Sequence, residues 1–120
     1  MSIDHRREYI ISYDIGDPKR LQRIHRMLKR LAIPLQYSVF YTSMSERQRG
    51  KLADLLGRKI EPKEDDVRIY PLPSGYNVQY LGQPPFMEGL HPGAQSGQWT
   101  DAIDDILADE ARKQQKAEHD

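Results

Sequence analysis

Two helices with strong N-terminal signals alternate with strand-forming segments in the first 81 residues, and this order limits the fold more than any other feature. Residues 9–13 are mostly β-branched and aromatic, which is typical of a strand, and a turn with glycine and proline follows them. Asp17 then supplies an N-cap, and Pro18 suits the first helical position because its missing N–H is not needed there. Pro34 ends the helix. The pattern predicts a strand followed directly by a helix.

A second helix begins at a capping box formed by Ser45 and Gln48 and runs to about residue 58. Further extended segments, rich in residues that favour a pleated surface, are predicted at 36–42, 67–70 and 77–81. The order β-α-β-α-β-β predicts an α+β sandwich, with both helices on one face of a mostly antiparallel sheet. We assign residues 1–81 to this domain.

The helix that starts at Pro18 has one apolar and one cationic side. At 100° per residue, the apolar side carries Leu21, Ile24, Leu28 and Leu31. The opposite side, called the cationic stripe below, consists of Lys19, Arg23, Arg26 and Arg30. Arginine and lysine displace counterions from nucleic acid, so the stripe is a candidate nucleic-acid-binding surface. An ordinary solvated helix face has the same composition, and that alternative stays open.

Charge is divided unevenly along the chain. Residues 1–80 hold 15 Lys and Arg against 10 Asp and Glu, whereas residues 81–120 hold 3 against 8. Prolines and glycines predict a linker at 82–99, and an acidic amphipathic helix is predicted at 100–117. Its narrow apolar stripe contains Trp99, Ile103, Ile106 and Leu107. We expect these side chains to bind a partner, or else the helix to fold over the chain's own basic surface.

The composition also excludes several classes of protein. With no cysteine, the chain has no disulfide framework, no thiolate metal site and no cysteine nucleophile. No apolar run approaches the ~20 residues of a membrane span, and the first residues do not resemble a secretory signal, so we expect a cytoplasmic protein with no membrane partner. The sequence has no glycine-rich phosphate loop, esterase elbow or zinc-protease helix. The four histidines are scattered, and a surface role is expected for each.

Asp14 is the best candidate for chemistry, because it ends a strand just before a helix begins, where sheets often present reactive groups. A turn aspartate that only satisfies nearby amides is an equal alternative. One carboxylate is a poor site for Mg²⁺ or Mn²⁺, which prefer octahedral oxygen coordination. A metal at Asp14 therefore requires a second copy of the chain across a two-fold axis.

Three segments, taken in order, resemble the CRISPR-associated protein two family, the small subunit of the spacer-acquisition machinery. The segments are Tyr13-Asp14-Ile15 with the basic helix that follows, Gln36-Tyr37-Ser38-Val39-Phe40, and Asp66-Val67-Arg68-Ile69-Tyr70-Pro71-Leu72. The resemblance covers about residues 9–81 and implies a ferredoxin-like βαββαβ fold, with the 35–42 region split or bent into two strands. It also implies a homodimer in which the short last strand, at 77–81, adds to the partner's sheet.

The same resemblance implies two kinds of activity. Some members of the family cut single-stranded RNA or double-stranded DNA with Mg²⁺ near the dimer axis, and Asp14 matches their metal-binding aspartate. Positions tied to that activity are matched by Tyr13, Arg20, Ser38 and Phe40. In spacer acquisition the dimer instead bridges copies of the integrase, CRISPR-associated protein one, and supports a duplex DNA fragment on basic surfaces.

We expect the scaffold to be the physiological role, as a DNA-binding homodimer that serves the integrase in acquiring foreign DNA spacers. Endonuclease activity of the isolated dimer stays open, with one Mg²⁺ or Mn²⁺ site shared across the dimer axis. The alternative is a toxin-like endoribonuclease of the virulence-associated protein D type, which shares the fold.

Overall fold

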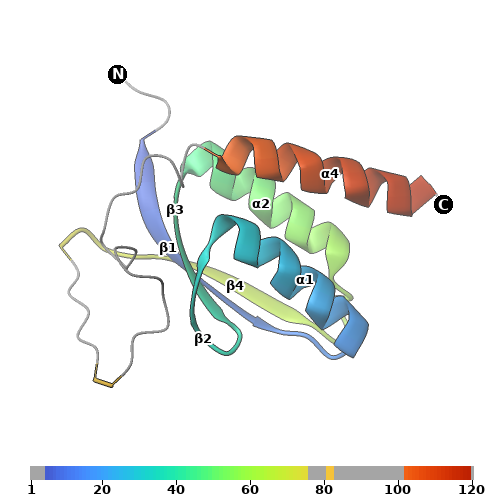
Figure 1. Cartoon of the computed structure of the whole chain (residues 1–120), viewed down its shortest axis with the longest axis horizontal. Helices are drawn as coiled ribbons and strands as arrows, with labels where there is room; N and C mark the ends of the chain where they lie inside the picture. The colour runs from blue at the N-terminus through green and yellow to red at the C-terminus, as the bar shows by residue number, and fades with distance from the viewer. Residues whose placement is uncertain (1–4, 76–80, 83–101, 120) are drawn as a thin grey trace.

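A computed structural model describes residues 5–75, 81–82 and 102–119, and Figure 1 shows its two layers. One layer is an antiparallel sheet in the order β2-β3-β1-β4, made of β1 (Arg6–Asp14), β2 (Ile33–Gln36), β3 (Val39–Ser45) and β4 (Asp66–Pro71). The other layer contains α1 (Pro18–Leu31), α2 (Glu46–Lys59) and α4 (Ile103–His119). This is the ferredoxin-like α+β fold that was predicted. None of the described helices is long and apolar enough to cross a membrane.

Both predicted capping signals are present and explain where α1 and α2 begin. The Asp17 side chain accepts a hydrogen bond from the Arg20 backbone N–H, and Pro18 occupies the first turn of α1. At the start of α2, Ser45 and Gln48 exchange the two bonds of a capping box.

The extended segment predicted at 36–42 is two strands rather than one. A turn at Tyr37 and Ser38 separates β2 from β3, and Ser38 has a φ of 67°, in the left-handed region. The periodicity did not show this break, because both halves are rich in strand formers, but the family resemblance did imply it. The strand predicted at 77–81 lies outside the described residues except for Leu81.

The core lies between the sheet and the helices. Alternate residues of β1, among them Tyr9, Ile11 and Tyr13, point to the helices and are buried, and α1 covers them with Ile24 and Leu28. Burying a large apolar side chain of this kind stabilises the fold by about 1.5–3 kcal/mol. The described elements place no helix on the opposite face of the sheet (Figure 1).

The C-terminal helix α4 is part of this domain and not a separate tail. Ile103 and Leu107 belong to the same buried core, and Ile106 packs against it. Ile103 and Leu107 were predicted to bind a partner, but in this conformation they are buried in the chain's own core and are not available to one. Ile106 is half-buried, and Trp99 lies outside the described residues. Ion pairs to α1 and α2 hold the acidic side, as the alternative prediction expected: Arg30 with Asp109 (2.7 Å), Arg47 with Asp104 (3.2 Å) and Arg58 with Glu118.

Candidate active site at the end of the central strand

Asp14 ends β1 with its side chain on the face of the sheet opposite the helices. Strand residues alternate in direction, so the buried Tyr13 points to the helical layer and the exposed Asp14 points away from it. Asp14 makes no hydrogen bond or ion pair with any residue in the described part of the chain. Its register partner on β4 is Asp66, whose carboxylate pairs with Arg68 at 3.0 Å. Asp14 is thus a free carboxylate at a solvent-exposed strand end.

Tyr13 and Phe40 lie together on the other face, inside the core. Their rings stack with centroids 6.1 Å apart, and Phe40 is fully buried. The Tyr13 hydroxyl is 2.7 Å from Nδ1 of His25, whose ring also contacts Phe40. Burial, with a smaller effect of Tyr37, raises the pKa of the Tyr13 hydroxyl. Tyr13 and Phe40, both predicted to be catalytic, therefore pack on the helical face of the sheet, opposite Asp14. His25, which was predicted to lie on the surface, is half-buried and contacts both of them.

Ser38 contributes to the site through its backbone. Its carbonyl oxygen accepts a hydrogen bond of 3.1 Å from the Tyr13 N–H. The left-handed turn at Ser38 aims that carbonyl at the end of β1, just beyond the last paired residue of β3. The bond fixes the backbone immediately before Asp14.

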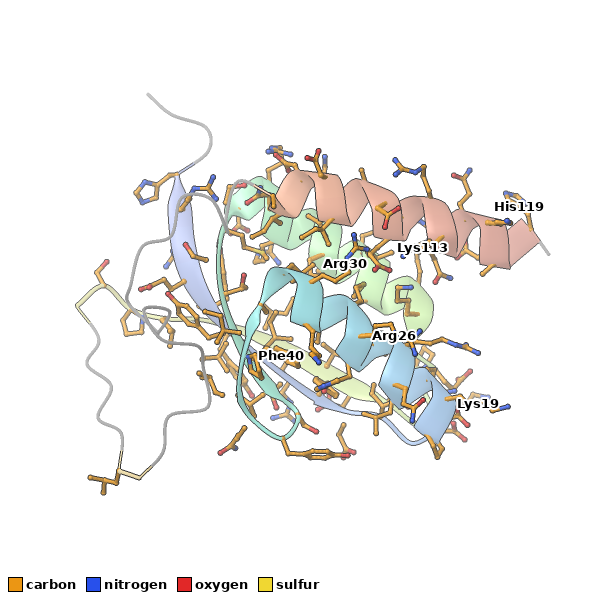
Figure 2. The ribbon with its side chains drawn as sticks, in the orientation of Figure 1. Lys19, Arg26, Arg30, Phe40, Lys113 and His119 are labelled. Atoms are coloured by element: carbon orange, nitrogen blue, oxygen red, sulfur yellow. The ribbon has the colours of Figure 1, made fainter. Side chains whose placement is uncertain are left out.

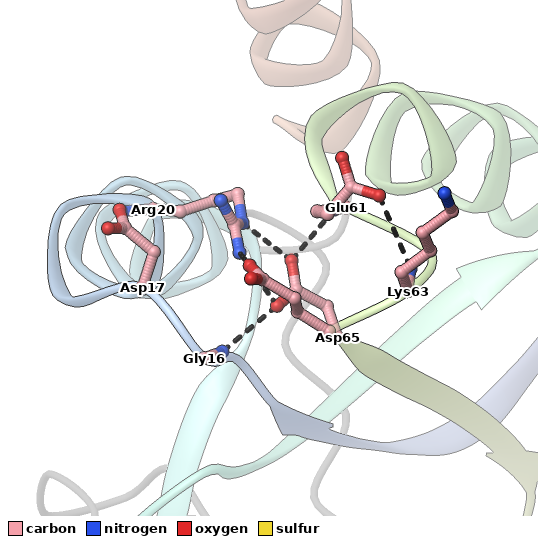
Figure 3. Close-up of polar contacts among 7 residues, drawn as sticks. Gly16, Asp17, Arg20, Glu61, Lys63 and Asp65 are labelled. Atoms are coloured by element: carbon pink, nitrogen blue, oxygen red, sulfur yellow. Dashed lines mark hydrogen bonds and ion pairs between the residues drawn. The ribbon is translucent and has the colours of Figure 1, made fainter.

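Arg20 is bound by acidic residues rather than presented to solvent (Figure 3). Its guanidinium reaches the turn before β4 and donates to both oxygens of Asp65, at 2.6 and 3.0 Å, and to Glu64 at 3.0 Å. The fully buried Asp65 carboxylate also accepts from the backbone N–H groups of Gly16 and Glu61. Arg20 first, and then these amides, hold the pKa of Asp65 well below its usual range.

This Arg20 clamp connects the start of α1 to the start of β4 and so fixes the loop that follows Asp14. Arg20 was predicted to act on a substrate, but in this conformation its donors are used by Asp65 and Glu64. Asp65 was missed because it stands in a run of three acids, from Glu64 to Asp66, that looks like an ordinary turn.

The described residues of one protomer do not supply enough ligands for a divalent cation. Within residues 5–75, 81–82 and 102–119, no group of three or more His, Cys, Asp or Glu side chains is placed to hold a metal. The free Asp14 is one oxygen donor of the type that Mg²⁺ and Mn²⁺ prefer. Asp14 fits such an ion if another copy of the chain supplies a second carboxylate.

The cationic stripe lies on the exposed side of α1, as predicted, but its members differ in their partners. Arg30 pairs with Asp109 and Glu110 of α4. Lys19, Arg23 and Arg26 make no ion pair with any residue that the structure describes. Figure 2 shows Lys19 and Arg26 on α1 and Arg30 close to α4. Three of the four stripe residues are therefore available to an anionic ligand.

Comparison with known proteins places this fold and site in context. The sequence profile described as CRISPR associated protein Cas2 matches residues 7–79. A protein of Nitrosomonas europaea named CRISPR-associated endoribonuclease Cas2 1 is 39% identical over 92 residues, which are 77% of this chain and 88% of the relative. Another, from Thermodesulfovibrio yellowstonii, named CRISPR-associated endoribonuclease Cas2 2, is 39% identical over 74 residues, 62% of this chain and 81% of the relative.

Solved structures agree with the sequence matches. A hypothetical protein from Thermus thermophilus superposes with a TM-score of 0.61 and 32% identity, covering 68% of this chain and 98% of the other. Cas2 of Streptococcus pyogenes superposes with a TM-score of 0.56 and 26% identity, covering 62% and 99%. Helix α4 begins at Ile103, well beyond the matched residues 7–79.

Proposed function

The chain belongs to the CRISPR-associated protein Cas2 family, and from this premise we propose that it acts as a homodimer in CRISPR spacer acquisition and carries a phosphodiesterase site at Asp14. Family membership favours this function over the toxin-like alternative. The curated relatives are named endoribonucleases, which makes single-stranded RNA the first substrate to test and double-stranded DNA the second.

The observation that carries the nuclease proposal is the free, exposed Asp14 on the sheet face that the described helices leave open. Ile10 and Tyr70 are neighbours on this face, and Tyr70 is 46% exposed. A sheet face with such side chains is suited to packing against a second sheet. Two copies that pack in this way about a two-fold axis supply the second Asp14 that one protomer lacks.

In the proposed dimer, the Asp14 carboxylates of the two copies would together hold one shared Mg²⁺ or Mn²⁺ ion. When bound, such an ion polarises a phosphodiester and lowers the pKa of a water that attacks it. The chain's own residues provide the positioning. The Tyr13 N–H bond to Ser38 fixes the strand end, and the Arg20 clamp fixes the loop after it, so that Asp14 is held at one place without a direct partner.

The test is a cleavage assay with single-stranded RNA and duplex DNA, in Mg²⁺ or in a chelator. Asp14→Asn should abolish metal-dependent cleavage and leave the fold intact, because the side chain is exposed. Asp105→Asn is the matched control, since Asp105 is also an exposed aspartate without an ion pair among the described residues. Cleavage that survives in Asp14→Asn, or that is lost equally in Asp105→Asn, would contradict the assignment.

The DNA-binding scaffold is the second part of the proposal and rests on a separate observation, the unpaired Arg23 and Arg26 on the exposed side of α1. Asp14→Asn should bind duplex DNA as tightly as the wild type, because the carboxylate does not contact the cationic stripe. Loss of each phosphate contact should reduce the slope of log K against log salt by about 0.9. The double variant Arg23→Gln with Arg26→Gln should therefore reduce this slope by up to about 1.8, which corresponds to two lost phosphate contacts. An unchanged slope would mean that the stripe is ordinary solvated surface.

Binding of the integrase, CRISPR-associated protein one, is the third part. The apolar stripe of α4 is occupied by the core, so the proposed contact uses the exposed side of this helix. Pull-down of the integrase by the full chain should weaken when Lys116 and Gln115, both exposed, are replaced by alanine. Undiminished capture would exclude this side of α4 as the contact.

A further inference from the structure

A pocket of about 430 Å³ lies where α1, the end of α2 and the C-terminal half of α4 meet. This volume is within the usual range of ligand sites, about 300–1,000 Å³. Six cationic side chains line it, against a single acid, Glu110: Arg20, Arg23, Arg26, Arg58, Lys59 and Lys113. Figure 2 labels Arg26 and Lys113, which come from the two helices on either side of the pocket.

Half of these positive charges are already compensated. Arg20 pairs with Asp65, Arg58 with Glu118 and Lys113 with Asp109. Glu110, the one acid of the lining, is nearly buried and its carboxylate is bound by Arg30 at 2.8 Å. Arg23, Arg26 and Lys59 remain without an ion pair among the described residues. The pocket therefore carries about three uncompensated positive charges.

The excess positive charge is unfavourable at Lys59, which is partly buried without an anionic partner among the described residues. Its side chain is partly buried, and its ammonium donates to the Gln114 amide oxygen at 3.3 Å, with no carboxylate within ion-pair distance in the described part of the chain. Burial lowers the pKa of Lys59; Glu110 opposes that shift, while Lys113 and Arg23 add to it. A cation that is removed from water without an anionic partner is unfavourable, and a bound anion would relieve it.

We propose that this three-helix pocket is a binding site for a ligand with consecutive phosphate groups, held by Arg23, Arg26 and Lys59. Guanidinium groups bind phosphate oxygens in pairs, and the partly buried Lys59 ammonium adds a third donor group to the lining. Several phosphates fit the number of free cations better than one carboxylate would. The site is independent of the Asp14 chemistry, because the helices and the exposed Asp14 lie on opposite faces of the sheet.

The pocket depends on the part of the chain outside the family match. Helix α4 provides one wall, with Lys113 and Gln114, whereas the matched residues end at 79. Docking of Ile103 and Leu107 into the core is what holds this wall in place. The C-terminal helix thus gives the fold a ligand site in addition to an acidic surface.

Such phosphates have two sources, the backbone of a nucleic acid and a free oligophosphate. Calorimetry with sodium tripolyphosphate at low salt tests the shared chemistry on the full chain. We expect one site per protomer, weakened about tenfold or more by Lys59→Gln and by Arg23→Gln, as for the loss of a charge-assisted hydrogen bond. Lys29→Gln, which removes the same charge from an exposed position of α1 outside the pocket, should bind as the wild type does.

Competition with duplex DNA distinguishes nucleic-acid backbone phosphates from a free oligophosphate as the ligand. It also distinguishes this pocket from DNA binding by the cationic stripe alone. If tripolyphosphate displaces duplex DNA and Lys59→Gln weakens both, the pocket holds backbone phosphates. If Lys59→Gln weakens only tripolyphosphate, it holds a free oligophosphate. The proposal is overturned if tripolyphosphate does not bind, or if the Lys29→Gln control loses as much affinity as the pocket variants. In that case, duplex binding that depends on Arg23 but not on Lys59 would support DNA binding by the cationic stripe and exclude phosphate binding in the pocket.

Discussion

Replacing Ile103 with alanine tests whether the C-terminal helix belongs to the core. The Ile103 side chain is fully buried in the cluster that also contains residues of the sheet, α1 and α2. Truncating a buried isoleucine to alanine costs about 2–5 kcal/mol, through lost burial and the cavity that remains. With a loss of about 3 kcal/mol and a urea slope of about 2 kcal/mol/M, the unfolding midpoint falls by about 1.5 M.

The assay is urea unfolding followed by far-ultraviolet circular dichroism. A single transition that moves as a whole is the expected result, since α4 and the sheet share one core. Gln115→Ala is the control, because it changes an exposed residue of the same helix and should leave the midpoint nearly unchanged. If Ile103→Ala leaves the main transition where it was, or if a small transition of α4 separates from it, the helix is an independent tail and the reasoning fails.

Three further substitutions test the residues around Asp14. Asp65→Asn should lower the free energy of unfolding at pH 7. Because the pKa of Asp65 is depressed in the folded state, its charged carboxylate stabilises the wild type fully above about pH 5, and this stabilisation is lost on acidification. The free energy of unfolding should therefore fall more steeply below about pH 5 in the wild type than in Asp65→Asn. A parallel decline of both proteins would refute the clamp. Tyr13→Phe should lower the free energy of unfolding in urea by about 1 kcal/mol and leave cleavage intact, because the Tyr13 hydroxyl bonds to His25 on the helical side of the sheet. A variant that is folded but inactive would show that the Tyr13 hydroxyl is needed for cleavage. Ser38→Gly should preserve stability and cleavage, whereas Ser38→Val should cost about 1–2 kcal/mol, because only the left-handed backbone is required; equal stability of the two variants would argue against this role.

Local signals predicted most of the fold. The caps at Asp17 and Ser45 act within one helical turn of themselves, so they identify the starts of α1 and α2 without knowledge of the rest of the chain. The split between β2 and β3 depends on one left-handed residue, Ser38, and serine gives no strong signal for that conformation. Here the family resemblance supplied what the periodicity did not.

The site was harder to predict because it depends on which face each side chain occupies and on distant partners. Asp14 and Tyr13 are adjacent in sequence, yet the strand places them on opposite faces of the sheet. Arg20 and Asp65 are 45 residues apart and meet only in the folded chain. The apolar stripe of α4 was found, but a pattern of spacing does not say whether the surface that covers it belongs to the same chain.

Mixing subunits tests the central claim, that two Asp14 carboxylates form one site, most directly. Wild-type protein and Asp14→Asn protein are combined in equal amounts, allowed to exchange subunits, and assayed for Mg²⁺-dependent cleavage at fixed total concentration. If both carboxylates are required, only dimers with two wild-type copies are active, and the rate should fall to about one quarter of the wild-type value. A rate of about one half, in proportion to the wild-type chains present, would show that each Asp14 works alone and would contradict the shared site.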